Sequence, residues 1–382
     1  MPVKIKNLEK AAERIKQAVA NNERIILYGD SDLDGISSVV ILEEAIKSLG
    51  GQIDSAFFPD RENDGYGINL NALNALKDKA PALLITLDLG IGNINEVDVA
   101  NKMGFEILIV DHHETLSGIP NASIVVDPKQ PADDYPFKGL ANVGITFNLC
   151  GELLQDNLSQ NLKNSFLELS ALGTIADMVP QVDQNEKIIE EGLRSLKNTF
   201  RPALRAFLDI LGEGAVFEGS LGKIISALNA AESVNFENES YSLLICSDKR
   251  KCKETAQKLI DKNRYKQQQV KNIIQEIERR VSQKPDEPII FEGDPSWHLI
   301  LAGSVASTIC QKYNKPAFIY KKMDQESCGS VRNPKGTNSV EAMKTCSDFL
   351  LTYGGHAQAS GFRVKNKDLE KFEKCLNDFF KK

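Results

Sequence analysis

The first half of the chain alternates short apolar runs with longer amphipathic stretches. Four runs are nearly continuous in β-branched and other apolar residues, which is typical of strands buried on both faces of a parallel sheet. They cover residues 23–30, 82–90, 105–114 and 122–128. The segments with helical periodicity cover residues 36–50, 68–80 and 93–104, and Gly104 is placed to end the last of them. This alternation predicts an α/β fold with a doubly wound, mostly parallel sheet.

The second half has a different pattern. An α-rich region runs from about residue 144 to residue 235, and the polar segment 248–282 has the pattern of one long helix. The stretch KPDEP interrupts the pattern at 284–288, and strand-like runs resume from Ile289. We therefore predict three parts, with a smaller mixed α/β domain at the end. Their bounds are 1–215 for the first domain, 216–284 for a helical connector and 285–382 for the last domain.

Composition narrows the class of protein. Apolar residues make up 42% of the chain and charged residues 26%, which excludes a disordered or fibrous protein. No apolar run approaches the length that spans a bilayer, and the polar N-terminal stretch lacks the apolar core of a signal peptide. The seven cysteines form no C-x-x-C pair, so we expect reduced thiols in a cytoplasmic protein without a zinc ribbon or iron–sulfur cluster.

Charge is unevenly distributed. The net charge of −7 argues against wholesale wrapping of nucleic acid but allows a local basic groove. Residues 248–282 carry eleven basic and five acidic side chains. Two interpretations stay open for this segment: a solvated linker helix, or a helix that also lines a groove following phosphates.

Acidic residues and histidines gather where the predicted strands end. The first strand ends in D-S-D-L-D-G at 30–35, the second in Asp88 and the third in D-H-H at 111–113. In open α/β sheets, ligands bind outside the carboxyl ends of the strands, so these side chains should share one edge. Asp177, in the α-rich region, is a further candidate.

Crowded carboxylates raise one another's pKa values unless cations neutralise them. Carboxylates with one or two imidazoles suit Mn²⁺ or Mg²⁺ better than zinc. A carboxylate bridging two ions about 3.5–4 Å apart would create a two-metal hydrolytic site. An EF-hand loop is excluded because its twelfth position is Ile41 and a strand precedes it. The remaining alternative is that the acids only cap helices. It would require that each of the three strands is followed by a capping acid by coincidence.

These motifs resemble the DHH phosphoesterase family, and within it the RecJ-like exonucleases specific for single strands. The triplet at 111–113 is the family's signature, and the matching motifs cover nearly the whole chain. The others are F-F-P-D-R-E-N-D-G-Y-G-I at 57–68, L-A-N-V-G-I-T-F at 140–147, G-T-I-A-D-M-V-P at 173–180, G-S-V-R at 329–332 and G-G-H-A-Q-A-S-G-F at 354–362. The resemblance implies a catalytic domain at 1–215 and a substrate-binding domain at 285–382.

The resemblance also implies roles for individual residues. Asp88 would bridge two Mn²⁺ or Mg²⁺ ions. The implied metal ligands are Asp30, Asp32, Asp34, Asp88, His112 and Asp177. The implied catalytic residues are Asp30, Asp88, Asp111 and His113, with His113 facing the scissile phosphate and Asp111 orienting the histidines. Arginine holds phosphate bidentately. The implied substrate-binding residues are Arg61, Ser330 and Arg332 for a terminal 5′-phosphate, with Gly354, Gly355 and His356 gripping the strand.

Several positions depart from the family pattern. Tyr28 stands where many members have a histidine, Glu232 and Ser233 replace a glycine and a basic residue, Lys266 stands for an arginine, and Ile300 stands for a glycine. We also expect no OB-fold of the kind that holds single strands in many relatives, because the residues after the last motif are too few to form one.

We therefore expect a metal-dependent exonuclease that degrades single-stranded DNA, 5′→3′, to mononucleotides, with replication or repair proteins as further partners and no membrane contact. Two alternatives stay open. One is a nanoRNase or dinucleotide phosphodiesterase of the same fold. The other is a replication-associated scaffold without catalysis, which the complete set of carboxylates disfavours.

Overall fold

The computed structural model describes residues 3–61, 64–115, 118–212, 221–284, 286–355 and 357–381. The chain separates into two compact units, Met1–Asn263 and Arg264–Lys382. The boundary falls inside one helix, α11 (Lys249–Val281), which confirms the single long helix expected at 248–282. The division into three parts at residues 215 and 284 stays a prediction.

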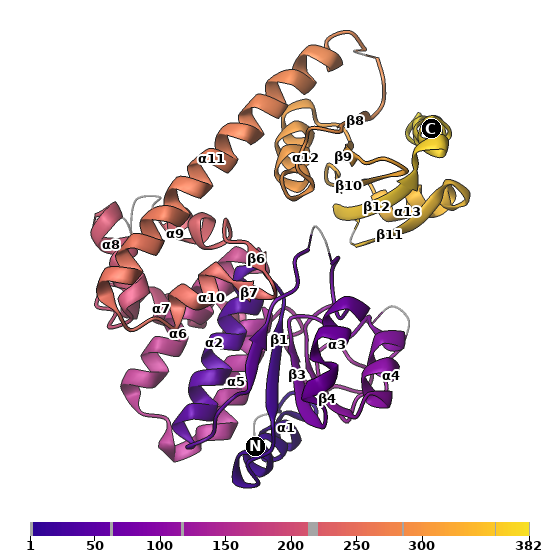
Figure 1. The fold of residues 1–382 in the computed structure, drawn as a ribbon. Helices are drawn as coiled ribbons and strands as arrows, with labels where there is room; N and C mark the ends of the chain where they lie inside the picture. The colour runs from indigo at the N-terminus through magenta and orange to yellow at the C-terminus, as the bar shows by residue number, and fades with distance from the viewer. Residues whose placement is uncertain are drawn as a thin grey trace. The chain divides into compact units, whose positions relative to one another are not determined.

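The N-terminal unit contains a five-stranded sheet in the order β2-β1-β3-β4-β5 (Figure 1). All neighbouring strands are parallel. The strands are β1 (Ile25–Gly29), β2 (Ser55–Phe57), β3 (Ala82–Leu87), β4 (Phe105–Val110) and β5 (Ile124–Val126). The predicted doubly wound parallel sheet is confirmed. The short edge strand β2 was not predicted, because its residues do not form an apolar run.

Alternate residues of each strand face opposite layers of helices, because the side-chain period of a strand is two. In β1, Leu27 packs toward one apolar core and Ile26 toward the other. The first core contains α1 (Leu8–Ala20), α2 (Leu33–Ser48) and α5 (Asn142–Leu154). The second contains α3 (Leu70–Leu76) and α4 (Ile94–Lys102), so helices cover both faces of the sheet (Figure 1).

The rest of the N-terminal unit is mainly helical. Its helices are α6 (Gln160–Ala176), α7 (Asp183–Leu196), α8 (Pro202–Leu211), α9 (Leu221–Leu228) and α10 (Glu239–Leu244). A two-stranded hairpin, β6 (Ser233–Val234) with β7 (Glu237–Asn238), precedes α10. Helix α2 is buried on almost every side because α5 and α6 pack on it opposite the sheet.

The C-terminal unit contains a mixed sheet in the order β11-β12-β10-β9-β8. Only β8 and β9 are parallel among these paired strands. The strands are β8 (Ile290–Asp294), β9 (Ala317–Lys322), β10 (Glu326–Arg332), β11 (Leu350–Gly355) and β12 (Ala359–Lys365). One apolar core lies under α12 (Leu299–Tyr313), and a second lies under α13 (Ser339–Thr345) and α14 (Leu369–Phe380). The smaller mixed α/β domain is therefore confirmed.

The expectation of seven reduced thiols was wrong for one pair. Cys346 and Cys375 are joined by a disulfide, with their Cα atoms 6.0 Å apart. They lie 29 residues apart in the sequence, and the packing of α14 beside α13 brings them together. The other five cysteines are free. Among the described residues, no helix is both long and apolar enough to cross a membrane.

Candidate metal centre

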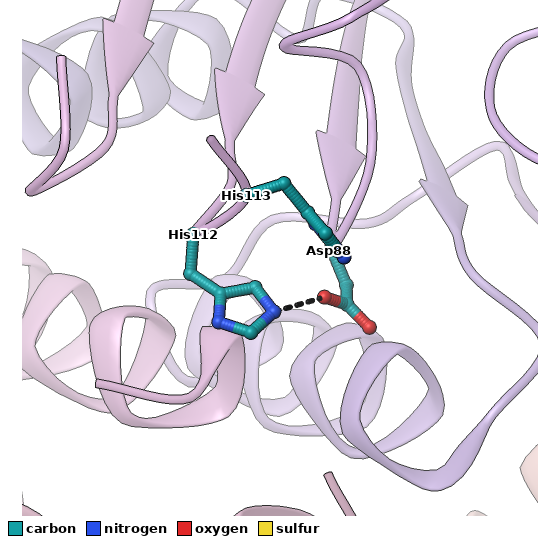
Figure 2. Close-up of side chains that lie close together, drawn as sticks. All are labelled: Asp88, His112 and His113. Atoms are coloured by element: carbon teal, nitrogen blue, oxygen red, sulfur yellow. Dashed lines mark ion pairs between the residues drawn. The ribbon is translucent and has the colours of Figure 1, made fainter. Parts of the chain in front are cut away.

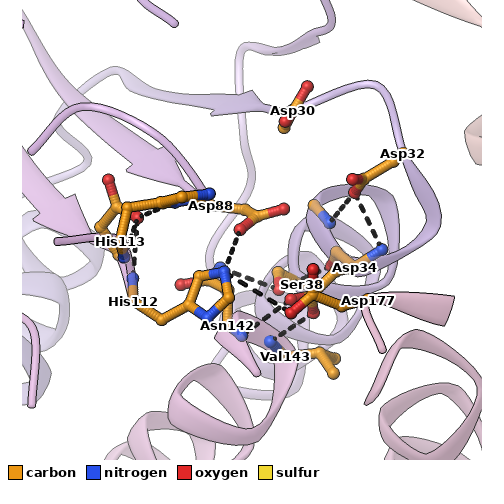
Figure 3. A network of polar contacts seen from close by, with 12 residues as sticks. Asp30, Asp32, Asp34, Ser38, Asp88, His112, His113, Asn142, Val143 and Asp177 are labelled. Carbon is orange, nitrogen blue, oxygen red and sulfur yellow. Dashed lines mark hydrogen bonds and ion pairs between the residues drawn. The ribbon is translucent and has the colours of Figure 1, made fainter. Parts of the chain in front are cut away.

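Acidic and imidazole side chains meet at the carboxyl edge of the parallel sheet (Figures 2 and 3). Asp30 directly follows β1, Asp88 follows β3 and the Asp111–His113 triplet follows β4. These three strands are neighbours and parallel, so their ends lie together. Asp88 has a backbone φ of 67°, a left-handed conformation that costs free energy for a residue with a side chain. Such strain is concentrated at functional sites.

Three groups of side chains have potential ligand atoms within 4.8 Å of one another. They are Asp30 with Asp32 and Asp88; Asp88 with His112 and His113; and Asp34 with His112 and Asp177. Asp88 and His112 each belong to two groups, so the groups form one continuous centre. The structure thus brings together every residue that the resemblance implied as a metal ligand.

The N-terminus of α2 positions two of the acids. Asp32 caps this helix, with its Oδ1 accepting hydrogen bonds from the backbone N–H groups of Asp34 and Gly35. Both oxygens of Asp34 accept backbone N–H bonds from the start of α5, at 2.8 Å from Asn142 and 2.7 Å from Val143 (Figure 3). Asn142 was missed as a site residue, although it stands inside the motif at 140–147.

Close packing explains the glycine after Asp34. A Cβ atom on Gly35 would lie 2.6 Å from the carbonyl oxygen of Asp30. Only glycine therefore lets α2 begin so near the end of β1, which is what brings the acids of the two segments together.

His112 presents one ring nitrogen to the centre. Its Nδ1 lies 3.1 Å from the carbonyl oxygen of Leu140, which can only accept a hydrogen bond, so Nδ1 carries the proton. Its Nε2 lies 3.3 Å from Asp88 Oδ1 (Figure 2) and 3.7 Å from Asp177 Oδ2. Within the described part of the chain, His112 Nε2 and Asp177 Oδ2 are buried without a hydrogen-bond partner. Buried polar atoms of this kind are normally satisfied, so they fit a bound cation.

The electrostatics of the cluster also fit a cation. Burial and then neighbouring acids raise the pKa values of Asp34 and Asp88 well above their usual range. The same causes raise the pKa of Asp177 to about 7, and burial lowers the pKa of His112 to about 4. A bound divalent ion would favour the ionised acids and the neutral imidazole, which are the forms that bind metals.

Asp111 is held by protein donors. Its Oδ1 accepts bonds from the backbone N–H groups of His112 and His113 and lies 2.8 Å from His113 Nδ1, while its Oδ2 accepts from Ile91 N–H. Burial alone would lower the pKa of His113, but the hydrogen bond to Asp111 and the charges of Asp111, Asp30 and Asp177 together outweigh burial and raise that pKa to about 9. Asp111 therefore fixes the position of the His113 ring and favours its protonated form.

The loop after β2 adds two side chains. Arg61 forms ion pairs with Asp30 and Asp32, with Nε at 2.7 Å from Asp30 Oδ1 and Nη2 at 2.9 Å from Asp32 Oδ2. The Tyr66 hydroxyl donates to the carbonyl oxygen of Asp88 and lies 3.2 Å from the ring nitrogens of His113. Tyr66 was missed as a site residue, although its G-Y-G motif was recognised.

Three of the implied substrate-binding residues of the C-terminal unit, Ser330, Arg332 and Gly354, share one sheet face. In the register, Ser330 pairs with Gly361, and Gly361 pairs with Gly354. Arg332 lies two residues after Ser330 and so faces the same side. A Cβ atom on Gly354 would meet nothing within 4 Å, so the glycine leaves open surface here.

The neighbouring positions show how this face is built. A Cβ atom on Gly303 of α12 would lie 3.4 Å from Arg332 Nη2 and 3.7 Å from Ser330 Oγ. Gly355 has φ of 122° and needs to be glycine, since its Cβ would lie 2.6 Å from the Ala359 carbonyl oxygen. His356 lies outside the described residues.

Three residues that depart from the family pattern have the following surroundings. The Tyr28 hydroxyl, which takes the place of a histidine, donates to the carbonyl oxygen of Gly67 at 3.2 Å. Glu232 forms an ion pair with Lys262 of α11 at 2.8 Å. Ile300 is half-exposed in the first turn of α12.

The chain is similar to known proteins in sequence and in domain content. Residues 24–174 match the N-terminal domain of the DHH family, and residues 286–382 match the DHHA1 domain. The single-stranded-DNA-specific exonuclease RecJ of Bacillus subtilis (strain 168) is 34% identical over 99% of this chain, which spans 48% of that relative's length.

Solved structures are similar in fold. A crystal structure of exonuclease RecJ bound to manganese superposes with a TM-score of 0.81 at 26% identity, covering 100% of this chain and 96% of that one. RecJ of Thermus thermophilus in complex with Mn²⁺ gives a TM-score of 0.84 at 24% identity, covering 100% of this chain and 55% of that one.

Proposed function

Because this chain belongs to the DHH family, we propose that it is a Mn²⁺- or Mg²⁺-dependent phosphodiester hydrolase that degrades single-stranded DNA from its 5′ end and releases mononucleotides. The observation that carries the proposal is the meeting of carboxylates and imidazoles from three strand ends, with Asp88 shared between two groups of ligand atoms. The manganese-bound relative, which this chain matches over its full length, supports the choice of ion.

The proposed ligands of the two ions are Asp30, Asp32, Asp34, Asp88, His112 and Asp177. Ions bound at such a site activate a water molecule and stabilise the charge that develops on the phosphoryl group. Asp88 would contact both ions. The hydrogen bond between Asp111 and His113 would hold the protonated His113 ring toward the scissile phosphate. A fixed positive charge at that point stabilises the transition state.

Substrate recognition would involve both units of the chain. Arg61 is proposed to contact a terminal 5′-phosphate once metal ions occupy the carboxylates with which it now pairs. In the C-terminal unit, Ser330 and Arg332 of β10 are proposed to bind a terminal 5′-phosphate, and Gly354, Gly355 and His356 are proposed to hold the strand. A planar guanidinium offers two parallel donors to a phosphate, which a lysine does not.

A second function has one specific observation in its favour. Glu232 stands where the family has a glycine and neutralises Lys262, and the net charge of the chain is −7. Both features weaken the attraction to long polyanions and favour short oligonucleotides or dinucleotides. The alternative of a scaffold without catalysis has no such support, because no carboxylate of the centre is missing.

The test is hydrolysis of end-labelled oligomers. The protein, with Mn²⁺ or with EDTA, is incubated with DNA and RNA of two to thirty nucleotides labelled at the 5′ or the 3′ end. We expect metal-dependent release of labelled mononucleotides from the 5′ end of long DNA. Cleavage of dinucleotides alone would favour the second function, and full activity in EDTA would contradict both.

The proposal also includes a cellular setting. The substrate would be single-stranded DNA in the cytoplasm, with the replication and repair proteins that expose such strands as partners. The relatives named for single-stranded DNA support the nucleic-acid substrate.

A further inference from the structure

A cavity of about 510 Å³ lies in the N-terminal unit between α6, α7 and the turn that leads into α8. The lining residues that matter here are Asn161, Asn164, Glu191, Arg194, Phe200 and Arg201. The residues of α6 that line it come from the first half of that helix, whereas Asp177 follows its last residue. Nine positions separate Asp177 from Glu168, the last residue of α6 that lines the cavity, which corresponds to about 14 Å along the helix. The cavity is therefore separate from the candidate metal centre.

An exposed aromatic ring stands at the cavity. The side chain of Phe200 is 88% exposed, which is unusual for so large an apolar group. Its neighbours are fixed: Thr199 donates to the buried carboxylate of Glu168 at 2.5 Å, and the buried guanidinium of Arg201 binds Glu44 at 2.8 Å. Phe200 is thus held in solvent by an ordered backbone, as an aromatic surface on which a flat ligand could stack.

Polar groups line the same cavity. Arg201 is 7% exposed, and its Nε is buried without a hydrogen-bond partner among the described residues, although its Nη atoms are bonded. The exposed Arg194 forms no ion pair within the described part of the chain. The amides of Asn161 and Asn164 offer both donors and acceptors, and Glu191 offers acceptors only.

We propose that this cavity binds a nucleoside monophosphate. Aromatic side chains stack on any base, and amide side chains can pair with base edges. Arg194 would bind the phosphate and Glu191 the hydroxyl groups of a ribose. This combination of one ring, several amides and one unpaired guanidinium matches the base, the base edge and the phosphate of a nucleotide. It matches a peptide or a second copy of the chain less well.

The proposal goes beyond the proposed function and does not depend on it. The deoxynucleoside monophosphates expected as products of the metal centre belong to the same chemical class, so a separate site that accepts them would let product concentration influence the protein. The binding itself can be measured without catalysis, in metal-free protein.

The experiment is calorimetric titration of the whole protein with AMP in EDTA. We expect saturable binding to wild type and to Asp88→Asn alike. Phe200→Ala should bind at least fivefold more weakly, because base stacking on an aromatic ring is worth ~5-fold or more in affinity. Arg194→Gln should weaken AMP while leaving adenosine unchanged. Val234→Ala, which removes an exposed apolar side chain elsewhere, serves as the matched control.

Each of the following outcomes would overturn the proposal. They are no saturable binding of AMP at millimolar concentration, equal binding by wild type and Phe200→Ala, and loss of binding in Asp88→Asn, which would assign the nucleotide to the metal centre. Binding of inorganic phosphate as tight as that of AMP would also contradict it, since the base would then contribute nothing. Unchanged thermal midpoints would show that the variants remain folded.

Discussion

At Asp88, a strained backbone places one carboxylate between two groups of ligand atoms. The left-handed φ turns the chain immediately after β3, so that the side chain reaches both Asp30 with Asp32 and His112. A free energy cost of order 1–3 kcal/mol for such a conformation is retained only where the surrounding structure compensates for it. Here the surrounding structure is the buried sheet edge.

We expect Asp88→Asn to remove activity and one equivalent of bound metal while the fold survives. The amide keeps the volume of the side chain but supplies one neutral oxygen instead of two anionic ones. Turnover on labelled oligomers and Mn²⁺ stoichiometry by mass spectrometry would be compared with Asp78→Asn, which alters an exposed acid. A variant with more than about a tenth of wild-type turnover, a loss below ~1.4 kcal/mol, would rule out the bridging role.

The raised pKa values of the acids predict how the stability of the metal-free protein depends on pH. Asp177 has a pKa of about 7 in the folded protein, above that of an unfolded chain. Between these two values only the folded state retains the proton, so the free energy of unfolding falls as pH rises toward 7. Asp34 and Asp88 shift in the same direction.

Thermal unfolding in EDTA should therefore occur at a lower temperature at pH 8 than at pH 5. Saturating Mn²⁺ should reverse this order, because bound cations stabilise the ionised carboxylates. A thermal midpoint in EDTA that rises between pH 5 and pH 8 would mean that the acids are not crowded as described.

Among the elements, β10 carries the recognition proposed for the C-terminal unit. Its alternation places Ser330 and Arg332 on one side, beside the glycine positions of β12 and β11, and buries Val331 on the other. The sheet therefore presents an arginine next to a surface without side chains, where a backbone of phosphates and sugars could approach closely.

We expect Arg332→Ala to abolish the preference for a 5′-phosphate over a 5′-hydroxyl. Losing a hydrogen bond to a charged group costs about 1.5–3 kcal/mol. Degradation rates of matched 5′-phosphorylated and 5′-hydroxyl oligomers would measure the effect, with Lys374→Ala, an exposed basic residue on α14, as the control. Equal rates already in the wild-type protein would remove the basis for this role.

The disulfide links the end of α13 to α14. Closing a segment with a sequence separation of 29 residues is worth about 3–4 kcal/mol in the chain-entropy model. We expect Cys346→Ser and Cys375→Ser to lower the thermal midpoint of the oxidised protein equally. A reductant should lower wild type to the same value and leave both variants unchanged. A wild-type midpoint indifferent to reductant would indicate that the thiols are not bonded in solution.

At the scale of the whole molecule, the negative net charge opposes binding of the proposed substrate, single-stranded DNA. The net charge is −7, and two lysines of α11 are paired with acids of the N-terminal unit, Lys258 with Glu239 and Lys262 with both Glu239 and Glu232. The basic surplus of this helix is thus partly neutralised by its own neighbours. Binding of long single strands should be weak and should depend steeply on salt.

Glu232→Gln should strengthen binding of single-stranded DNA several-fold, because it releases Lys262 from one acid and removes a negative charge. Fluorescence anisotropy with a labelled oligomer at low salt would measure the change, and the gain should shrink as salt increases. Glu237→Gln removes an equally exposed acid nearby and serves as the control. Identical gains in both variants would indicate a general charge effect rather than the release of Lys262.

The sequence by itself determined the parallel sheet, the long helix and the acids at the strand ends. Strands buried on both faces require continuous apolar runs, and the residue after such a run must lie at the carboxyl edge. The types of ligand and their order along the chain were therefore predictable from local pattern alone. The same local signals did not predict β2, which is short and only partly buried.

Only the tertiary structure decided which side chains meet. Asp177 comes from a helix 89 positions after Asp88, Arg61 pairs with Asp30 and Asp32, and Asn142 holds Asp34 through its backbone. Periodicity reports the local backbone and which face is buried, whereas these contacts depend on how distant helices pack on the sheet. The disulfide was not predicted for the same reason. The spacing of two cysteines in the sequence does not show that α13 and α14 pack together and bring them into contact.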